Sequence, residues 1–172
     1  MLAATVLGAA AVPASANAAI APGDYRIATG ASAFTKVLDV QGGFTGDGAR
    51  VIQFTSHGGT NQRWRVTQTG ATAGGTPVYS LRPHNNLNKC IDIQGASTAI
   101  GAGALTFQCG PGAHQQFFIT RESGAYRIVA RHSGLTLTMP SFNNSAQIIQ
   151  RLGPIPPSQS LPTSQQFRFS RL

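Results

Sequence analysis

The chain has 172 residues, only 10% of them charged, and its 13 basic and five acidic residues give a net charge of +8. So few charged side chains argue against long surface helices, which use Glu and Lys. The composition favours instead a turn-rich β protein with a single core. The positive charge would suit nucleic acid, an anionic glycan or a membrane surface, but a mere scarcity of acidic residues also produces it.

Residues 2–19 form an apolar run of small side chains, with no charge before Asp24. Small-x-small cleavage sequences occur at 14–16 and 16–18. We therefore expect a secretory signal peptide over residues 1–18 and a secreted mature chain from residue 19. An Ala-rich tail is the alternative. The run is short and interrupted by Pro13, so we expect no membrane span there, nor in any later stretch.

A Gln-x-aromatic phrase closes three successive stretches of the chain, at Gln62-Arg63-Trp64, Gln115-Gln116-Phe117 and Gln165-Gln166-Phe167. The copies begin 53 and 50 residues apart, and a tyrosine precedes each Gln by 36 to 39 residues. Self-similarity at a nearly fixed period predicts one unit copied three times. The repeats cover about residues 23–69, 76–121 and 123–172.

Taken in chain order, the first repeat contains alternating stretches typical of strands at 25–28, 37–40, 51–54 and 64–66. Gly- and Asn-rich turns separate them. Four strands per repeat predict an all-β fold of roughly twelve strands, which must close on one another to remove edges. Trp64, Phe117 and Phe167 should lie in the shared core. Each Gln of the closing phrase, Gln165 included, should satisfy backbone groups of the adjacent turn.

Two cysteines distinguish the second repeat from the first. The two repeats align without gaps at an offset of 53, which places Cys90 and Cys109 over Val37 and Ser56. In an oxidising destination the pair should form a disulfide, contributing about 3 kcal/mol. The pair lacks further ligands at the usual spacing for zinc, so we expect no metal and no cofactor.

The stretches KVLDV…VIQFTS…TNQRW, KCIDI…ALTFQC…AHQQF and, more weakly, GLTLTM…QIIQRL…SQQF resemble the repeats of the ricin B-chain type lectin family. The resemblance covers about residues 23–172. It implies a three-fold β-trefoil over residues 19–172 that binds carbohydrate, of a galactose or xylan type, and is not an enzyme. The family often occurs fused to hydrolases or toxins, so a separately encoded enzyme or toxin is a possible partner.

Sugar binding needs an acceptor for neighbouring hydroxyls, a flat ring for the C–H face and an amide that fixes orientation. The first repeat offers Asp39, Phe54 and Asn61, with Gln62 behind them. The second offers Asp92, Phe107 and His114, with Gln115 behind them. We predict that these eight residues form two sugar sites.

Several positions depart from the family pattern. Phe54 and Phe107 stand where Trp or Tyr is preferred, and His114 replaces Asn, which can alter preference or pH dependence. In the third repeat Thr138 takes the Asp position, Arg151 falls about where the ring should be, and a Pro-rich stretch follows. We therefore expect no sugar site of the usual type in the third repeat.

Structural roles remain open for the same residues. Asp39 and Asp92 could be turn residues that bind backbone amides, and Phe54 and Phe107 could belong to the core. The other histidines have no ligand-like spacing and are expected at the surface: His57, His84 and His132.

Three other functions compete with sugar binding. A polyanion could bind arginines near the repeat closures, although no nucleic-acid motif accompanies them and nucleic acid is not the expected partner; these are Arg63, Arg65, Arg168 and Arg171. A protein-interaction or inhibitor module could use the loop 153–163. A hydrolase is the least supported function, because Asp24, Asp47 and Glu122 form no credible carboxylate pair and no nucleophile-elbow sequence occurs.

Overall fold

The computed structural model describes residues 19–122, 124–154 and 160–172, so the expected signal peptide lies outside the described residues. The first repeat contains β1 Gly23–Thr29, β2 Lys36–Val40, β3 Ala49–Thr55 and β4 Trp64–Ala71. The second contains β5 Pro77–Pro83, β6 Lys89–Ile93, β7 Ala104–Gln108 and β8 Phe117–Glu122. The third contains β9 Ala125–Ala130, β10 Thr136–Thr138, β11 Ala146–Gln147, β12 Ile149–Arg151 and β13 Phe167–Arg171. All four strands expected in the first repeat are present, and the third repeat has one more because its third strand is divided at Ile148.

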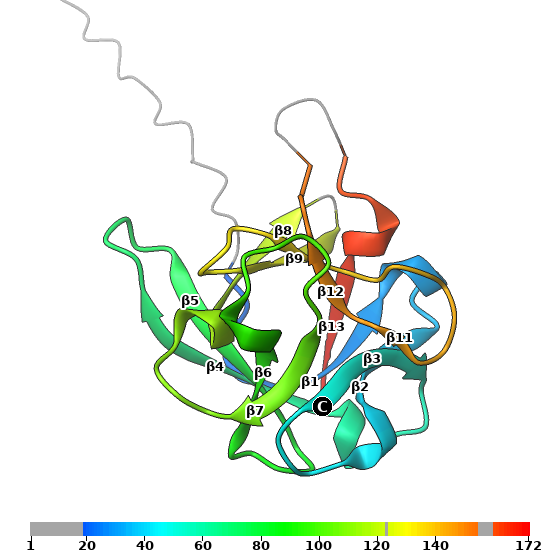
Figure 1. Ribbon diagram of the computed structural model, residues 1–172. Helices are drawn as coiled ribbons and strands as arrows, with labels where there is room; N and C mark the ends of the chain where they lie inside the picture. Colours follow the sequence, from blue (N-terminus) through cyan, green and yellow to red (C-terminus); the bar gives the residue numbers. More distant parts are fainter. Residues whose placement is uncertain (1–18, 123, 155–159) are drawn as a thin grey trace, which may run out of the picture.

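Six strands, the first and last of each repeat, close into a barrel. β1 pairs with β4, β4 with β5, β5 with β8, β8 with β9, β9 with β13, and β13 returns to β1. The middle strands of each repeat form hairpins, β2–β3, β6–β7 and β10–β12, that cap the barrel (Figure 1). This is the predicted β-trefoil, and barrel closure leaves few strand edges exposed.

The spacing between each tyrosine and its closing phrase is explained by cross-strand pairing in the barrel. Tyr25 lies opposite Trp64, Tyr79 opposite Phe117, and Tyr126 opposite Phe167. The three closing aromatics are fully buried. Because the Trp64 indole is buried, its N–H needs a partner, and it donates to the Leu38 carbonyl at 3.0 Å.

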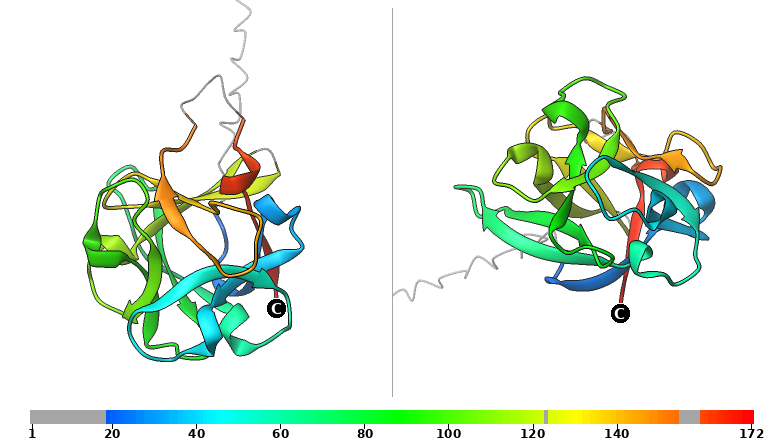
Figure 2. Two further views of the ribbon diagram at one scale, coloured as in Figure 1. Left: turned by 45° about the vertical axis from the view of Figure 1, so that its right-hand side comes forward. Right: turned by 60° about the horizontal axis from the view of Figure 1, so that its bottom comes forward.

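The three caps meet around the pseudo-three-fold axis. β3 pairs with β7 through Ala49 and Thr106, and with β11 through Gln53 and Ala146. A bridge between Gly103 and Ile149 completes the contact between the second and third repeats. The segment before β11 therefore lies beside β3, a neighbour from the opposite end of the sequence (Figure 2).

Short 3-10 turns carry the ends of strands toward the cap. They are η1 Gly30–Ser32, η2 Gln41–Gly43, η3 Thr60–Gln62, η4 Gln94–Ala96, η5 Ala113–Gln115 and η6 Thr163–Gln165. Gly42 and Gly95 adopt the left-handed conformation at φ 65°, which glycine enters without the Cβ penalty. These turns place η2 and η4 directly after the strands that carry Asp39 and Asp92.

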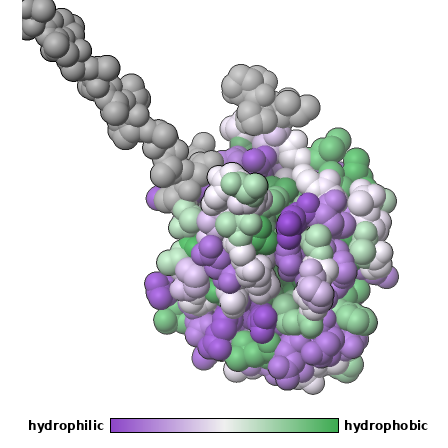
Figure 3. Space-filling model, turned by 90° about the vertical axis from the view of Figure 1, so that its left-hand side faces the viewer, coloured by the Kyte–Doolittle hydropathy of each residue, from purple (hydrophilic) through white to green (hydrophobic). Residues whose placement is uncertain are grey.

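The disulfide prediction is confirmed. Cys90 and Cys109 are bonded, with their Cα atoms 5.0 Å apart, so the covalent link lies in the second repeat alone. Within the described residues no helix has the length and apolarity that crossing a membrane requires. On the face drawn in Figure 3, hydrophilic and hydrophobic residues are interspersed.

Candidate functional site

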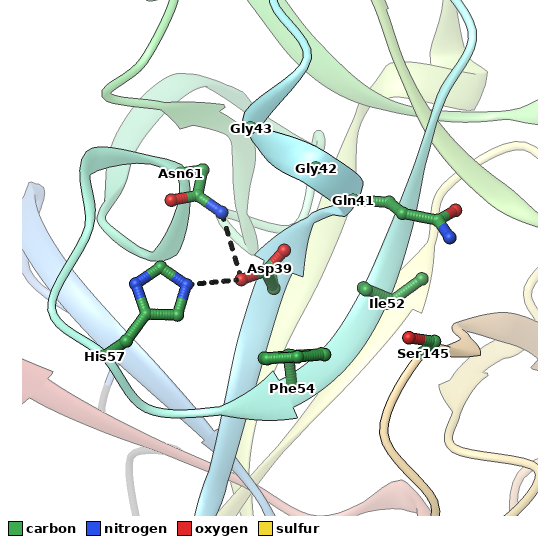
Figure 4. A pocket seen from close by; sticks show the side chains of 9 residues that line it. All are labelled: Asp39, Gln41, Gly42, Gly43, Ile52, Phe54, His57, Asn61 and Ser145. Carbon is green, nitrogen blue, oxygen red and sulfur yellow. Dashed lines mark hydrogen bonds and ion pairs between the residues drawn. The ribbon is translucent and has the colours of Figure 1, made fainter.

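A pocket of about 530 Å³ opens on the cap of the first repeat, and we call it site 1 (Figure 4). Strands β2 and β3, turn η2 and the segment around η3 supply most of its walls, and the third repeat supplies one residue. The lining consists of Asp39, Gln41, Gly42, Gly43, Ile52, Phe54, His57, Asn61 and Ser145. Three predicted sugar-site residues, Asp39, Phe54 and Asn61, are therefore brought together in one depression.

Asp39 is the central polar group of site 1. Its side chain is on β2 and only 3% of the residue is exposed. One oxygen, Oδ2, accepts hydrogen bonds from Asn61 Nδ2 at 3.0 Å and Gln62 Nε2 at 2.8 Å, and lies 3.3 Å from His57 Nε2. Among the described residues, no donor reaches the other oxygen, Oδ1. One oxygen is thus held by the protein, while the other can accept a hydroxyl of a ligand.

Gln62 fixes Asp39 from behind the pocket. The Gln62 side chain is fully buried. Its amide nitrogen donates to Thr55 O as well as to Asp39, and its Oε1 accepts from the backbone amides of His57 and Gly58. The predicted bonding of this Gln to the adjacent turn is present. The burial makes Gln62 a positioning residue and leaves it without direct access to a ligand.

Burial dominates the electrostatics of the carboxylate. Desolvation raises the pKa of Asp39 above its ordinary value, and the hydrogen bond from Gln62 and the nearby His57 imidazole offset part of that rise. A buried carboxylate that keeps one free oxygen forms stronger hydrogen bonds to a neutral ligand than an exposed carboxylate does.

The second repeat carries a smaller pocket of about 350 Å³, which we call site 2. It is lined by Gly48, Asp92, Gln94, Gly95, Ala96, Leu105, Phe107 and His114. Asp92 Oδ2 accepts from Gln115 Nε2 at 2.7 Å and lies 3.3 Å from His114 Nε2. Gln115 is buried behind the carboxylate like Gln62, and burial again raises the pKa of Asp92. Asp92, Phe107 and His114 are thus brought together as predicted.

An imidazole faces the carboxylate in both sites, but from different positions in the repeat. His114 occupies the register of Asn61, whereas His57 comes from the loop before η3. The expectation that His57 lies at the surface is confirmed, but its spacing in the sequence did not indicate that it lines a pocket. Its side chain is 49% exposed, yet it lines site 1 beside Asp39. Register alone could not reveal this contact, because the residue aligned with His57 is Gly110.

The two phenylalanines stand at the pocket walls. Phe107 is 46% exposed and Phe54 is half-buried, so neither belongs to the core. Phe54 also meets the His57 ring edge-on, with ring centroids 6.3 Å apart. Asp39 and Asp92 lie inside strands and bind side chains of the closing phrase, which excludes the alternative that they are turn residues.

The third repeat has lost the chemistry of the other two. Thr138 occupies the Asp position, and its hydroxyl accepts from Gln165 Nε2 at 3.1 Å. Arg151 pairs across β10 with Thr136, the same register as Phe54 with Val37 and Phe107 with Cys90. The predicted replacement of the ring by Arg151 is therefore present. The loop 153–163, the candidate surface for a protein-interaction or inhibitor module, connects β12 to β13. Residues 155–159 of this loop lie outside the described residues.

The remaining histidines serve local contacts. His84 Nε2 lies 2.9 Å from Asp24 Oδ1, at the barrel. His132 Nε2 lies 2.9 Å from the Ser97 carbonyl, next to η4, and its ring is 6.3 Å from that of His114. His132 thus supports a wall of site 2, a role that sequence spacing did not indicate. Nowhere in the described residues do three or more His, Cys, Asp or Glu side chains gather as metal ligands.

Comparison with known proteins identifies the family of this chain. The family model described as ricin-type beta-trefoil lectin domain-like matches residues 15–102 and 60–151. The chain belongs to this family. It is therefore a carbohydrate-binding domain of the ricin B type, as the repeats predicted. No curated protein matches the chain.

Solved structures agree on the fold. The designed three-fold symmetric protein ThreeFoil is similar with a TM-score of 0.75 and 34% identity over 87% of this chain and 99% of its own. A ricin B-like lectin from Macrolepiota procera, solved in complex with lactose, gives 0.68 and 19% over 90% and 100%. An exo-beta-1,3-galactanase from Clostridium thermocellum gives 0.73 and 20% over 94% of this chain but 31% of its own. The last shows that this fold also occurs as part of an enzyme.

Proposed function

We propose that the protein is a secreted lectin-like domain that binds galactose-type or xylan-type sugars at site 1 and site 2. The observation that carries the proposal is a buried carboxylate beside an aromatic ring, with only one of its two oxygens bonded to the protein. In each site, one oxygen of a buried Asp is held by the closing Gln and faced by an imidazole. The other oxygen is left to accept sugar hydroxyls, and a phenylalanine supports the C–H face.

The relatives support the galactose part of this proposal. The Macrolepiota procera lectin binds lactose, a galactoside, and the bacterial enzyme is named for action on a β-1,3-galactan. The lectin has the fold of this chain, and the enzyme contains a part with this fold. Two shallow sites on one domain would gain avidity on a repetitive glycan, which favours a polysaccharide or a clustered surface glycan as partner.

A glycan array with the chain from residue 19, followed by calorimetry, tests the proposal. We expect binding to neutral galactosides or xylo-oligosaccharides, and a loss at each site when its carboxylate is removed by Asp39→Asn or Asp92→Asn. A charge-assisted hydrogen bond contributes about 1.5–3 kcal/mol, so each site should weaken roughly 10- to 100-fold. The matched control is Asp24→Asn, because Asp24 lies in neither pocket lining and pairs with Arg65 and His84 at the barrel. Unchanged binding in the Asp39→Asn, Asp92→Asn double variant would overturn the proposal.

A second function, binding of anionic glycans, is favoured by cations next to site 1. Arg63 Nη2 donates to Gly58 O at 3.0 Å, and Arg26 lies beside the same residue. Two other arginines of the expected cluster are engaged elsewhere: Arg65 pairs with Asp24 at 2.9 Å, and Arg168 lies 3.7 Å over the Phe34 ring.

Salt separates the two functions. Contacts of arginine with sulfate or carboxylate groups release counterions, so affinity for an anionic glycan should fall steeply between low and high salt. Binding through Asp and a ring should change little. Array binding confined to sulfated or uronic glycans, and abolished at high salt, would replace the first function by the second.

A further inference from the structure

One residue of site 1 comes from the third repeat. Ser145 lines the pocket together with residues of the first repeat. In Figure 4 its side chain lies across the pocket from His57 and Asn61, beyond Phe54 and Ile52. Asp39 lies between these two ends. A ligand that occupies the whole pocket would therefore contact the third repeat as well as the first.

The position of Ser145 is a glycine in the other repeats. The backbone amides of Gly48, Gly101 and Ser145 donate to the carbonyls of Thr106, Gln150 and Gln53, respectively, at 2.8–3.0 Å. All three residues adopt the left-handed conformation, with φ of 83°, 92° and 63°. Gly48 also lines site 2 as Ser145 lines site 1.

Serine is an unfavourable residue for this backbone conformation, because its Cβ crowds the following carbonyl. Its side-chain hydroxyl is exposed and makes no hydrogen bond to the described residues, so the strain is not offset by a local contact. Backbone strain that no structural contact offsets, at the wall of a pocket, indicates a functional role for the residue.

The wall that carries Ser145 is held rigidly against the first repeat. Gln53 Nε2 donates to the carbonyls of Ser141 and Asn143 at 2.7 and 2.9 Å. The Asn144 side chain accepts from the Thr55 backbone amide at 3.1 Å. A hydroxyl on such a supported wall would bind a ligand at little cost in ordering.

We infer that Ser145 is a specificity residue that forms a second sugar subsite in site 1. Asp39 and Phe54 hold the terminal sugar, and the Ser145 hydroxyl hydrogen-bonds the next unit of the chain. Site 2 has Gly48 at this position, and its volume is about 350 Å³, compared with about 530 Å³ for site 1. Site 2 therefore holds one sugar unit. The inference rests on the proposed function, since it assigns a longer ligand to the same site.

Calorimetry of site 1 alone tests this inference. In the Asp92→Asn background, galactose is compared with lactose and xylose with xylotriose, using protein produced without N-glycosylation because Asn143-Asn144-Ser145 fits an acceptor sequence. One lost neutral hydrogen bond corresponds to roughly a 3- to 10-fold change. Ser145→Gly and Ser145→Ala should both weaken the longer ligand by that factor, and the single sugar by clearly less.

Stability measurements exclude a trivial loss of folding. Ser145→Gly should raise the melting temperature, because it relieves the left-handed backbone, while it weakens the longer ligand. Gly101→Ser is the matched control: it introduces the same strain at the counterpart that lies in neither pocket lining, and should lower the melting temperature without changing either affinity.

The outcomes separate the two levels of the argument. If no sugar binds, or binding survives Asp39→Asn in this background, the proposed function fails, and the subsite with it. If binding depends on Asp39 but the Ser145 variants weaken both ligands equally, or neither, the subsite is overturned and the proposed function stands.

Discussion

Site 1 and site 2 use the same chemical groups, but different residues deliver them. Both have a buried Asp held by a closing Gln, a phenylalanine wall and an imidazole 3.3 Å from the carboxylate. In site 1 the imidazole comes from His57 and leaves room for Asn61, whereas in site 2 His114 takes the Asn position itself. Site 1 therefore presents an amide that site 2 lacks, and the two pockets differ in their polar groups while both keep the carboxylate.

The supporting frames of the two sites differ in covalent structure. Cys90 and Cys109 close a loop in the second repeat, and Val37 and Ser56 stand at the same register in the first. Replacing both cysteines by alanine should cost about 3 kcal/mol of unfolding free energy. Denaturant unfolding measures this loss, and Val37→Cys with Ser56→Cys offers the reciprocal graft. Equal midpoints for the wild type and the double alanine variant would show that the disulfide contributes nothing.

Acid should weaken both sites by protonating their carboxylates. Burial raises the pKa of Asp39 and Asp92 above the ordinary 3.8, so both take up protons at a pH where exposed aspartates are still ionised. Loss of a charged acceptor removes about 1.5–3 kcal/mol of binding. Calorimetry from pH 7 down to pH 4 checks this in each single-site background. Constant affinity over that range would contradict it.

The stability effect of these carboxylates has the opposite sign from that of Asp24. A raised folded-state pKa means that Asp39 and Asp92 stabilise the fold below the unfolded pKa, and that this contribution is lost as the pH rises through the folded value. The Arg65 hydrogen bond lowers the pKa of Asp24 to about 2, so its contribution is lost as the pH falls toward that value. Circular dichroism over the same pH range should therefore show that the protein is still folded at the pH where calorimetry shows that sugar binding is lost.

Truncation of Phe54 and of Phe107 should affect sugar affinity to a similar extent but protein stability to different extents. Truncation by Phe54→Ala or Phe107→Ala should weaken the respective site by on the order of 1 kcal/mol. Phe54 also packs against His57, whereas Phe107 is nearly half exposed. The melting temperature should therefore decrease more for Phe54→Ala than for Phe107→Ala. A larger decrease in melting temperature for Phe107→Ala would contradict the prediction from burial.

The smallest expected effect concerns the floor of site 2. Ala96 adopts the left-handed conformation at φ 50°, and its counterpart in site 1 is Gly43 at φ 64°. Ala96→Gly should change stability by less than about 1 kcal/mol, because relief of strain and added chain entropy oppose each other. The substitution should also enlarge site 2, so that it binds a set of ligands more like that of site 1. Profiling on a glycan array in the Asp39→Asn background checks this, and an unchanged profile would show that the Ala96 methyl does not limit the ligand.

Much of the fold and part of each site could be predicted from the sequence. The repeat period, the strands, the closing aromatics and the cysteine pair are properties of local spacing, and they were confirmed in the trefoil. Asp39 and Asp92 stood out because they recur at one register with a phenylalanine 15 residues later. His57 was missed because it breaks that register, and no alignment of repeats can identify a contact that only one repeat makes.

The sequence by itself determined the three-fold unit, its core and the two carboxylates, since each is carried by residues close together in the chain or repeated at a fixed interval. The tertiary structure alone decided which Asp oxygen is free, which imidazole faces it, and that Ser145 completes a pocket of the first repeat. These depend on side-chain burial and on the pairing of β3 with β11, which joins residues about 90 positions apart. Such long-range contacts follow from closure of the whole barrel and cap, so no short stretch of sequence encodes them.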